Sequence, residues 1–264
     1  MSLRIQTNVE ALNAHRNLVS TSDHLSKAME RLSSGYRINR AADDAAGLAI
    51  SEKLQAQIGG LNQAQRNAQD AISLVQTAEG SLNEVHSMFQ RIRELAVQYQ
   101  NGTLSTSDKT AIASEVAQLT AEVERIGSTA QFNGISLLSA AATITFQVGA
   151  NDGDVITVAT VSLGSSVAIA TLAGATAISA IDAAIDAVSA RRAEFGAVQN
   201  RLEHTLNNLA TYEENLTASN SRVKDVDMAA EMVNFTKLQV LQQAGTAMLA
   251  QANQAPQGVL SLLR

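Results

Sequence analysis

The sequence predicts a mainly α-helical fold: an elongated, coiled-coil-like helical bundle with one β-hairpin, in which the N- and C-terminal helices pack together. Apolar residues recur at alternating steps of three and four over long stretches, which places them on one stripe of an α-helix. Only one proline, Pro256, occurs in 264 residues, so little interrupts these helices. Aromatic residues make up 3% of the chain, and the aliphatic residues that dominate instead suit close helix–helix packing.

The first helical segment lies near the N-terminus. Its apolar stripe follows a heptad: Ala11, Ala14, Leu18, Thr21, Leu25, Ala28 and Leu32. Gly35 is predicted to end this helix, and residues 39–47 form a connector. Asp43 and Asp44 precede the next stripe, where carboxylates cap a helix and stabilise its dipole.

The longest stripe predicts one helix over residues 58–99. Its members are Leu61, Ala64, Ala68, Ala71, Val75, Ala78, Leu82, Val85, Phe89, Ile92, Ala96 and Tyr99. Gly59 and Gly60 weaken its start and suggest a joint between segments. Asn101-Gly102 is predicted to stop the helix, and Thr106 or Ser107 to cap the next one, whose stripe runs from Ile112 to Ile126.

The apolar period changes to two near residues 143–160, which predicts the β-hairpin, with a turn at residues 149–154. Helix is predicted to resume near Ala177 and to continue to about Ser219, with Arg192, Gln199 and Glu213 interrupting its stripe. A last helical stretch carries Leu238, Leu241, Gly245, Met248 and Ala252 on one face.

Three regions follow from this order. Residues 1–45 form an N-terminal helix and connector, residues 46–220 a helical region with the hairpin, and residues 221–264 a C-terminal helix. The terminal helices bury little area as an isolated pair, so we expect them to be ordered mainly when many copies pack together. The residues expected to carry this self-assembly are Leu18, Leu25, Leu32, Leu241 and Met248.

Composition excludes several functional classes. The formal net charge of −6 argues against nucleic-acid binding, which needs a basic surface. There is no cysteine, hence no disulfide or thiolate metal site. The first ten residues contain no apolar signal-peptide region, and the apolar stretch at 167–181 is short and runs into Asp182, so no membrane insertion is expected.

No motif points to catalysis, a cofactor or a metal. The four histidines have no metal-ligand spacing, and the turn at Asn151–Asp154 lacks the full calcium-loop pattern. Asp43 and Asp44 are adjacent and point apart on a helix, which favours capping over acid–base work. Near Phe89, Arg91 and Leu95 lie off the predicted stripe. They form either a solvated face or a contact for another protein.

Several segments resemble bacterial flagellin. The N-terminal motifs are Leu32-Ser33-Ser34-Gly35-Tyr36-Arg37-Ile38-Asn39 and Asp43-Asp44-Ala45-Ala46-Gly47-Leu48-Ala49-Ile50. Gln131-Phe132-Asn133-Gly134 and Phe146-Gln147-Val148-Gly149-Ala150-Asn151 follow in the middle, and Gln251-Ala252-Asn253-Gln254-Ala255-Pro256-Gln257-Gly258-Val259-Leu260-Ser261-Leu262-Leu263-Arg264 stands at the C-terminal end. The chain is identified as a short form of this family, without the variable outer domains that many relatives insert after the hairpin.

The resemblance implies a structural subunit that self-assembles into the extracellular flagellar filament and serves swimming motility. The two terminal regions would form an inner-tube domain and residues 46–220 an outer-tube domain. Implied partners are other copies of the chain, the export chaperone, the flagellar type III export apparatus, and the filament cap and hook-associated proteins.

The resemblance also implies recognition by host immunity. Arg91, Leu95 and Glu115 match the segment that a flagellin-sensing Toll-like receptor recognises. Leu260, Leu262 and Leu263 match the region read by a cytosolic sensor and presented to the export chaperone. Two alternatives to the filament subunit stay open at this point: a hook–filament junction protein, and a secreted ligand whose main task is binding a host receptor.

Overall fold

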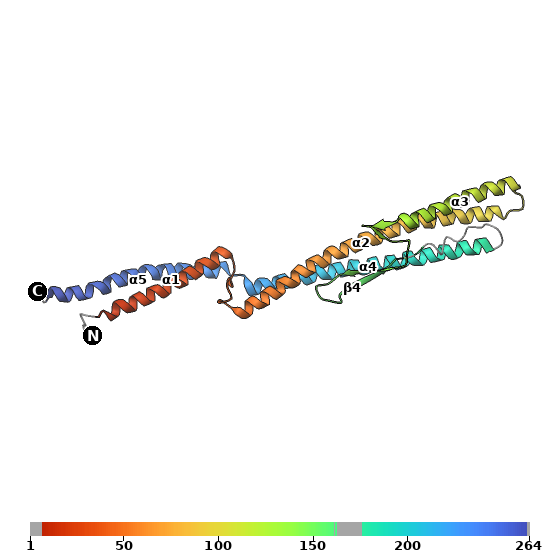
Figure 1. Ribbon diagram of the computed structural model, residues 1–264. Helices are drawn as coiled ribbons and strands as arrows, with labels where there is room; N and C mark the ends of the chain where they lie inside the picture. Colours follow the sequence, from red (N-terminus) through yellow and green to blue (C-terminus); the bar gives the residue numbers. More distant parts are fainter. Residues whose placement is uncertain (1–6, 161, 163–175, 263–264) are drawn as a thin grey trace. The chain divides into compact units, whose positions relative to one another are not determined.

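The computed structural model describes residues 7–160, 162 and 176–262 (Figure 1). Its helices over these residues are α1 (Val9–Ser34), α2 (Ala45–Tyr99), α3 (Thr106–Thr129), α4 (Thr176–Lys224) and α5 (Met228–Leu262). The mainly α-helical fold class is confirmed. The chain divides into two compact units, called here the terminal unit (Met1–Ala56 with Leu216–Arg264) and the central unit (Gln57–Asn215).

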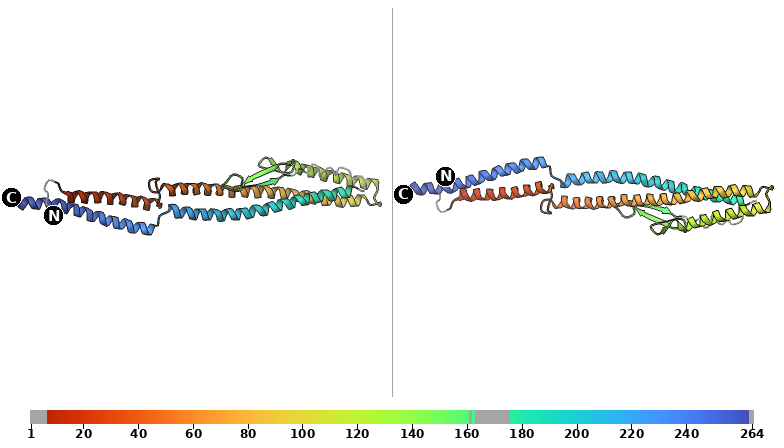
Figure 2. Two further views of the ribbon diagram at one scale, coloured as in Figure 1. Left: turned by 90° about the horizontal axis from the view of Figure 1, so that it is seen from below. Right: turned by 90° about the horizontal axis from the view of Figure 1, so that it is seen from above.

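In the central unit α2 and α4 run antiparallel, and α3 folds back along α2 (Figures 1 and 2). Side-chain contacts between the two helices show this antiparallel arrangement, because residues later in α2 contact residues earlier in α4. Arg93 pairs with Asp182, and Glu79 lies 3.7 Å from Arg192. Further along, Asn62 donates to the Glu213 carboxylate at 2.8 Å.

The core of the central unit is built on the predicted stripe of α2. Every member from Leu61 to Ala96 is at most 2% exposed, and Tyr99 is partly buried. Facing residues come from α3 and α4, including Val116, Val123, Val188 and Leu202. The stripe is therefore an intramolecular core of aliphatic side chains, as its spacing indicates.

Two antiparallel strand pairs lie between α3 and α4. The predicted hairpin is formed by β3 (Thr143–Gln147) and β4 (Val155–Ala159), with Thr145 opposite Thr157. A second, shorter pair was not predicted: β1 (Gln131–Phe132) and β2 (Ile135–Ser136). Its turn is Asn133-Gly134, both with positive φ (48° and 78°), which is the backbone that an Asn-Gly hairpin turn adopts.

The structure corrects two local predictions. The expected joint at Gly59-Gly60 is wrong, because α2 runs unbroken through both residues. Gly60 instead permits close approach: a Cβ there would lie 3.0 Å from the Ala150 Cβ in the hairpin turn. The cap of α3 is Ser105, not Thr106 or Ser107, because its hydroxyl and the Asp108 carboxylate satisfy each other's backbone N–H in a capping box.

In the terminal unit α1 and α5 run antiparallel side by side (Figure 2). Asn8 donates to the carbonyl oxygen of Ala252 at 2.7 Å at one end of the pair. Arg31 and Glu231 lie 4.0 Å apart at the other. The predicted packing of the N- and C-terminal helices is confirmed.

The end of α1 and the start of α2 follow the predicted signals. Gly35 caps α1 in the left-handed conformation (φ 76°), which residues with a Cβ adopt at a cost. Asp44 caps α2 by accepting a hydrogen bond from the Gly47 N–H at 2.8 Å. Over the described residues, none of the helices combines the length and apolar character needed to cross a membrane.

Candidate functional site: the terminal helix pair

The terminal unit has very little core of its own. Of the thirty buried hydrophobic residues in the described part of the chain, only Ala28, Ile38 and Leu238 belong to it. An antiparallel pair of helices with so few buried side chains gains little free energy against the conformational entropy of ordering it. The terminal unit is therefore weakly stabilised by its internal contacts.

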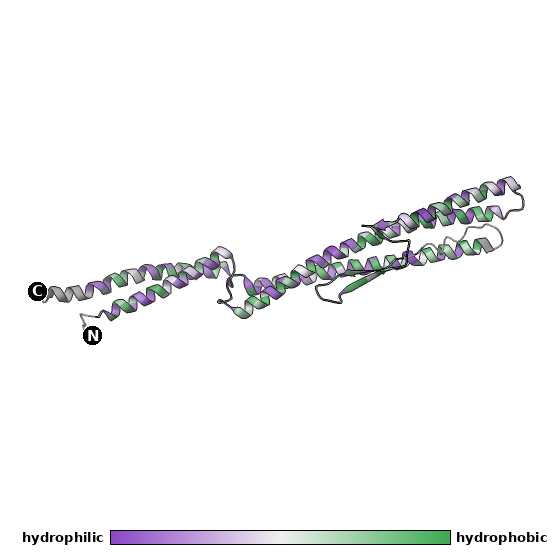
Figure 3. Cartoon of the chain, in the orientation of Figure 1, coloured by the Kyte–Doolittle hydropathy of each residue, from purple (hydrophilic) through white to green (hydrophobic). Residues whose placement is uncertain are grey.

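Many of its large apolar side chains are exposed instead. Twelve of the sixteen exposed large hydrophobic residues of the described chain lie in this unit. They are Val9, Leu12, Val19, Met29, Tyr36, Ile50, Met228, Met232, Val233, Val240, Leu241 and Met248. The hydropathy colouring shows apolar positions spread along α1 and α5 (Figure 3). A monomeric soluble protein seldom leaves so much apolar surface exposed to solvent. This surface is therefore suited to contact with another protein chain.

The predicted assembly residues divide into two groups. Leu18, Leu25 and Leu32 on α1 are partly buried. Leu241 and Met248 on α5 are 46% and 64% exposed. Leu18, Leu241 and Met248 line one open groove of about 780 Å³ between α1 and α5, whereas Leu25 and Leu32 lie outside it.

Gly245 also lines this groove. In the sequence it is only one member of the apolar stripe, and the stripe does not show that it contributes to assembly. A Cβ there would lie 3.2 Å from the Leu18 Cδ1, a tight contact, so glycine at this position favours the close approach of α5 to α1. Val233, at 70% the most exposed large hydrophobic residue, was also missed. Val233 lies outside the apolar stripe of this helix, which runs from Leu238 to Ala252.

The connectors of the terminal unit are paired by backbone hydrogen bonds. The Val226 N–H donates to the Gly35 carbonyl at 3.0 Å, and the Arg37 N–H donates to the Lys224 carbonyl at 2.7 Å. The Arg37 guanidinium also donates to the Val223 carbonyl at 2.6 Å. Asp43 accepts from the N–H of Arg40 at 3.0 Å. These bonds hold the connector through backbone groups, in a unit with few buried side chains.

A second candidate site, on the central unit, contains the predicted receptor residues Arg91 and Glu115. Their side chains join α2 to α3, with the Arg91 Nη2 2.9 Å from the Glu115 Oε1, and Arg91 also bonds Glu94. The hydrogen bond to Glu115, followed by that to Glu94, raises the pKa of Arg91 above its ordinary value. Both charged groups are exposed and face solvent.

The prediction that Leu95 projects from the surface is wrong. Leu95 is 2% exposed and belongs to the core. Because α2 packs against both α3 and α4, its buried surface is wider than one stripe, and Leu74 and Leu95 fill it beside the predicted residues. The structure thus brings Arg91 and Glu115 together at the surface and places Leu95 in the core of the unit.

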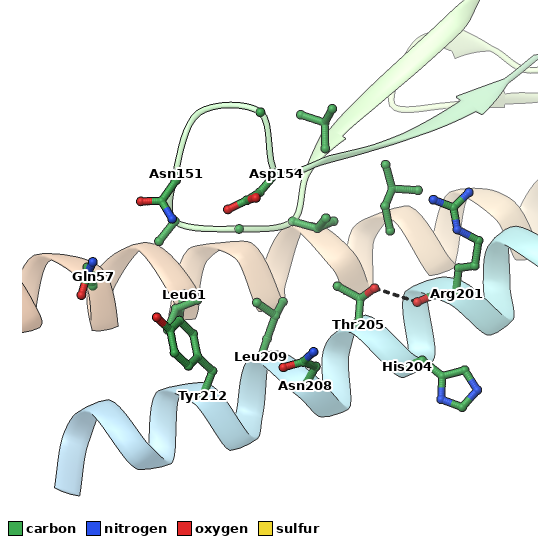
Figure 4. A pocket seen from close by; sticks show the side chains of 16 residues that line it. Gln57, Leu61, Asn151, Asp154, Arg201, His204, Thr205, Asn208, Leu209 and Tyr212 are labelled. Atoms are coloured by element: carbon green, nitrogen blue, oxygen red, sulfur yellow. Dashed lines mark hydrogen bonds between the residues drawn. The ribbon is translucent and has the colours of Figure 1, made fainter. Parts of the chain in front are cut away.

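An open groove of about 600 Å³ lies between the β3–β4 turn and the helices of the central unit (Figure 4). The turn carries Asn151 and Asp154, while Leu209 and Tyr212 come from α4. Its polar side chains are not buried, and no group of three potential metal ligands occurs among the described residues. Leu263 and the side chains of Leu260 and Leu262 lie outside the described residues.

Comparison with known proteins decides the family. The sequence model of the bacterial flagellin N-terminal helical region matches residues 5–143, and that of the bacterial flagellin C-terminal helical region matches residues 178–263. The chain belongs to the bacterial flagellin family. A flagellin of Halalkalibacterium halodurans is 54% identical to it, with 98% of this chain and 99% of the relative covered.

Other relatives of this flagellin-family chain agree. A flagellin of Bacillus subtilis is 46% identical over 99% of this chain and 100% of the relative. The flagellar filament 33 kDa core protein of Treponema phagedenis is 48% identical over 98% and 99%. The crystal structure of Bacillus cereus flagellin superimposes with a TM-score of 0.51 at 36% identity, over 55% of this chain and 88% of that one.

Proposed function

We propose that this chain, a structural subunit of the extracellular bacterial flagellar filament that serves swimming motility, polymerises through the apolar surface of its terminal unit. The observation that carries the proposal is the contrast between the two units. The central unit buries its hydrophobic residues internally. The terminal unit, in contrast, has twelve exposed large hydrophobic residues and only three buried hydrophobic residues among those described. Burial of this surface between copies supplies the free energy of assembly.

In this proposal the inner-tube domain consists of residues 1–45 and 221–264, and the outer-tube domain of residues 46–220. The division is supported by the connector at residues 35–44 and by the short break between α4 and α5. Leu18, Leu25, Leu32, Leu241 and Met248 contribute to packing in the inner layer. The exposed fractions of Leu241 and Met248, 46% and 64%, support this role most strongly.

A charge placed on this surface tests the proposal. Val233→Asp alters a side chain that is 70% exposed in the single subunit, so the subunit keeps its helix content while polymerisation stops. Leu25→Asp and deletion of residues 255–264 have the same outcome, with the central unit still helical. Ser26→Asp is the matched control, because Ser26 lies beside Asp23 and Lys27 on the polar side of α1.

The assay is seeded polymerisation of purified subunit, followed by electron microscopy and by circular dichroism of the subunit. The proposal predicts long filaments from the wild type and from Ser26→Asp, and none from Val233→Asp. Normal filaments from Val233→Asp and Leu25→Asp contradict it. The comparisons do not favour the junction-protein or receptor-ligand alternatives over the filament subunit.

The finer partners of this family are also proposed for the chain. Export through the flagellar type III apparatus with a chaperone on the C-terminal segment, and growth beneath a cap joined to hook-associated proteins, are supported by the family's C-terminal motif at residues 251–264. A cytosolic immune sensor is proposed to read Leu260, Leu262 and Leu263 in the same motif.

A flagellin-sensing Toll-like receptor is proposed to contact the exposed pair Arg91 and Glu115. Leu95, which is buried, acts by holding this part of α2 in place. Arg91→Ala therefore weakens receptor binding without changing the stability of the central unit, whereas Leu95→Ala lowers that stability. Unchanged receptor binding by purified, folded Arg91→Ala protein contradicts the proposed contact.

A further inference from the structure

The methionines are divided unequally between the two units. Over the described residues, Met29, Met228, Met232 and Met248 lie in the terminal unit and are 55%, 48%, 48% and 64% exposed. In the central unit, the only methionine among the described residues is Met88, which is partly buried against the core. Among the described residues, the exposed thioethers thus all lie on the surface through which the chain is proposed to polymerise.

The composition concentrates oxidation on these side chains. The sequence contains no cysteine and no tryptophan. A thiolate is the usual first target of a peroxide in a protein, and here none competes with the thioether sulfur. Since susceptibility follows exposure, a peroxide reacts with the four exposed methionines before it reacts with Met88.

We propose that Met29, Met228, Met232 and Met248 form an oxidation site that controls assembly: hydrogen peroxide converts them to methionine sulfoxide in the free subunit and thereby blocks polymerisation. The inference rests on the proposed function, because it assigns a regulation to the same surface. It adds that the block is reversible, since methionine sulfoxide is a substrate for reduction.

The chemistry balances with peroxide alone. The sulfur lone pair attacks one peroxide oxygen, an S–O bond forms and the O–O bond breaks. The departing hydroxide takes up the remaining peroxide proton and leaves as water. The sulfur loses two electrons and the peroxide gains them. In the reverse direction two thiols of a reductant form a disulfide, and the sulfoxide oxygen leaves as water.

The positions explain why a sulfoxide interferes. Met248 lines the groove with Leu18 and Leu241, where a polar oxygen replaces apolar contact. Met228 and Met232 are four residues apart, on one face of α5, and Met232 directly follows Glu231, which lies 4.0 Å from Arg31 of α1. A sulfoxide there puts a hydrogen-bond acceptor into a surface that assembly removes from water, and a Met-rich interface is disrupted by this change.

The first measurement compares oxidation of free subunit and of assembled filament by a brief peroxide treatment, with sulfoxide quantified at each methionine by peptide mass spectrometry. In the free subunit the four sites react faster than Met88. In the filament their rates fall by at least about tenfold while that of Met88 stays the same, because only the four become buried. Equal rates at the four sites in subunit and filament overturn the inference.

The second measurement follows seeded polymerisation of oxidised subunit whose helix content is unchanged. Oxidation raises the critical concentration by at least about tenfold, and treatment with methionine sulfoxide reductases restores the original value. The variant M29L/M228L/M232L/M248L retains apolar side chains of similar volume, so it assembles like the wild type and is insensitive to peroxide. Met88→Leu is the matched control and stays peroxide-sensitive.

The outcomes separate the two proposals. Normal assembly of wild-type subunit oxidised at all four sites, or equal peroxide sensitivity of the fourfold leucine variant, overturns the oxidation site and leaves the filament function intact. Normal assembly of Val233→Asp contradicts the proposed assembly surface itself. Peroxide-sensitive assembly of the wild type, absent from the fourfold variant and present in Met88→Leu, supports the oxidation site.

Discussion

Replacement of Leu95 by alanine distinguishes a core residue from a surface contact. Leu95 is 2% exposed, so the substitution removes buried methyl groups and leaves a cavity. Such a change lowers the free energy of unfolding by about 2–5 kcal/mol. With a urea dependence of about 2 kcal/mol per molar, the unfolding midpoint of the central unit falls by about 1–2.5 M. Val97→Ala, at a position two residues away that is 52% exposed, changes stability by less than about 0.5 kcal/mol.

Tyrosine fluorescence measures the unfolding of the central unit in the full chain. In a Tyr36→Phe background the remaining tyrosines, Tyr99 and Tyr212, both belong to that unit. Phenylalanine keeps a ring for the Lys224 ammonium, which lies 4.7 Å from the centre of the Tyr36 ring. If Leu95→Ala and Val97→Ala unfold within about 0.5 kcal/mol of each other, the assignment of Leu95 to the core is refuted.

Three further predictions concern the cap of α3, the Glu213 carboxylate between α2 and α4, and the connector between α1 and α2. Ser105→Ala lowers stability by about 1 kcal/mol in urea unfolding because Ser105 caps α3, whereas Ser107→Ala is neutral; the reverse order contradicts the capping box. Glu213→Leu leaves two amide donors of α2 without their acceptor and costs about 1–3 kcal/mol, and Glu213→Gln, which keeps an acceptor oxygen, costs less; equal losses would argue against this role. The hydrogen bond from the Arg40 N–H lowers the pKa of Asp43 below its ordinary value of 3.8. The ionised carboxylate therefore stabilises the folded connector above about pH 3.8, and this contribution is lost as the pH falls through the folded pKa. An NMR titration of the Asp43 carboxyl with a midpoint at or above 3.8 would rule this out.

The elements that the sequence predicts well are those with a long, regular pattern. The stripe from Leu61 to Tyr99 specifies the part of α2 over residues 58–99, because each step of three or four returns to one helix face. Leu74 and Leu95 were missed as core because a second stripe becomes necessary only when two neighbours pack on one helix. The number of neighbours is a tertiary property that the spacing in α2 does not contain.

Short and local features were less predictable. The β1–β2 pair has two-residue strands, too short for an alternating pattern, although Asn133-Gly134 between Phe132 and Ile135 is a hairpin-turn signal. From the sequence Gly60 suggests a joint between segments, because the residue that it contacts, Ala150, lies ninety residues away. On the surface proposed for assembly, Leu18 and Met248 can be predicted from the sequence, because each belongs to an apolar stripe of its helix. Val233 cannot, because a stripe records which residues share a face and not which faces stay uncovered.

Amide hydrogen exchange of α1 and α5, compared between dilute subunit and filament, tests most directly whether the terminal helices depend on neighbouring copies. We expect the amides of residues 9–34 and 228–252 to exchange in the subunit with little protection and to slow by at least about a thousandfold in the filament. The amides of α2 between Val75 and Phe89 are protected in both states, because their side chains are buried within the single chain. Protection of α1 and α5 in the dilute subunit equal to that of α2 would contradict the account.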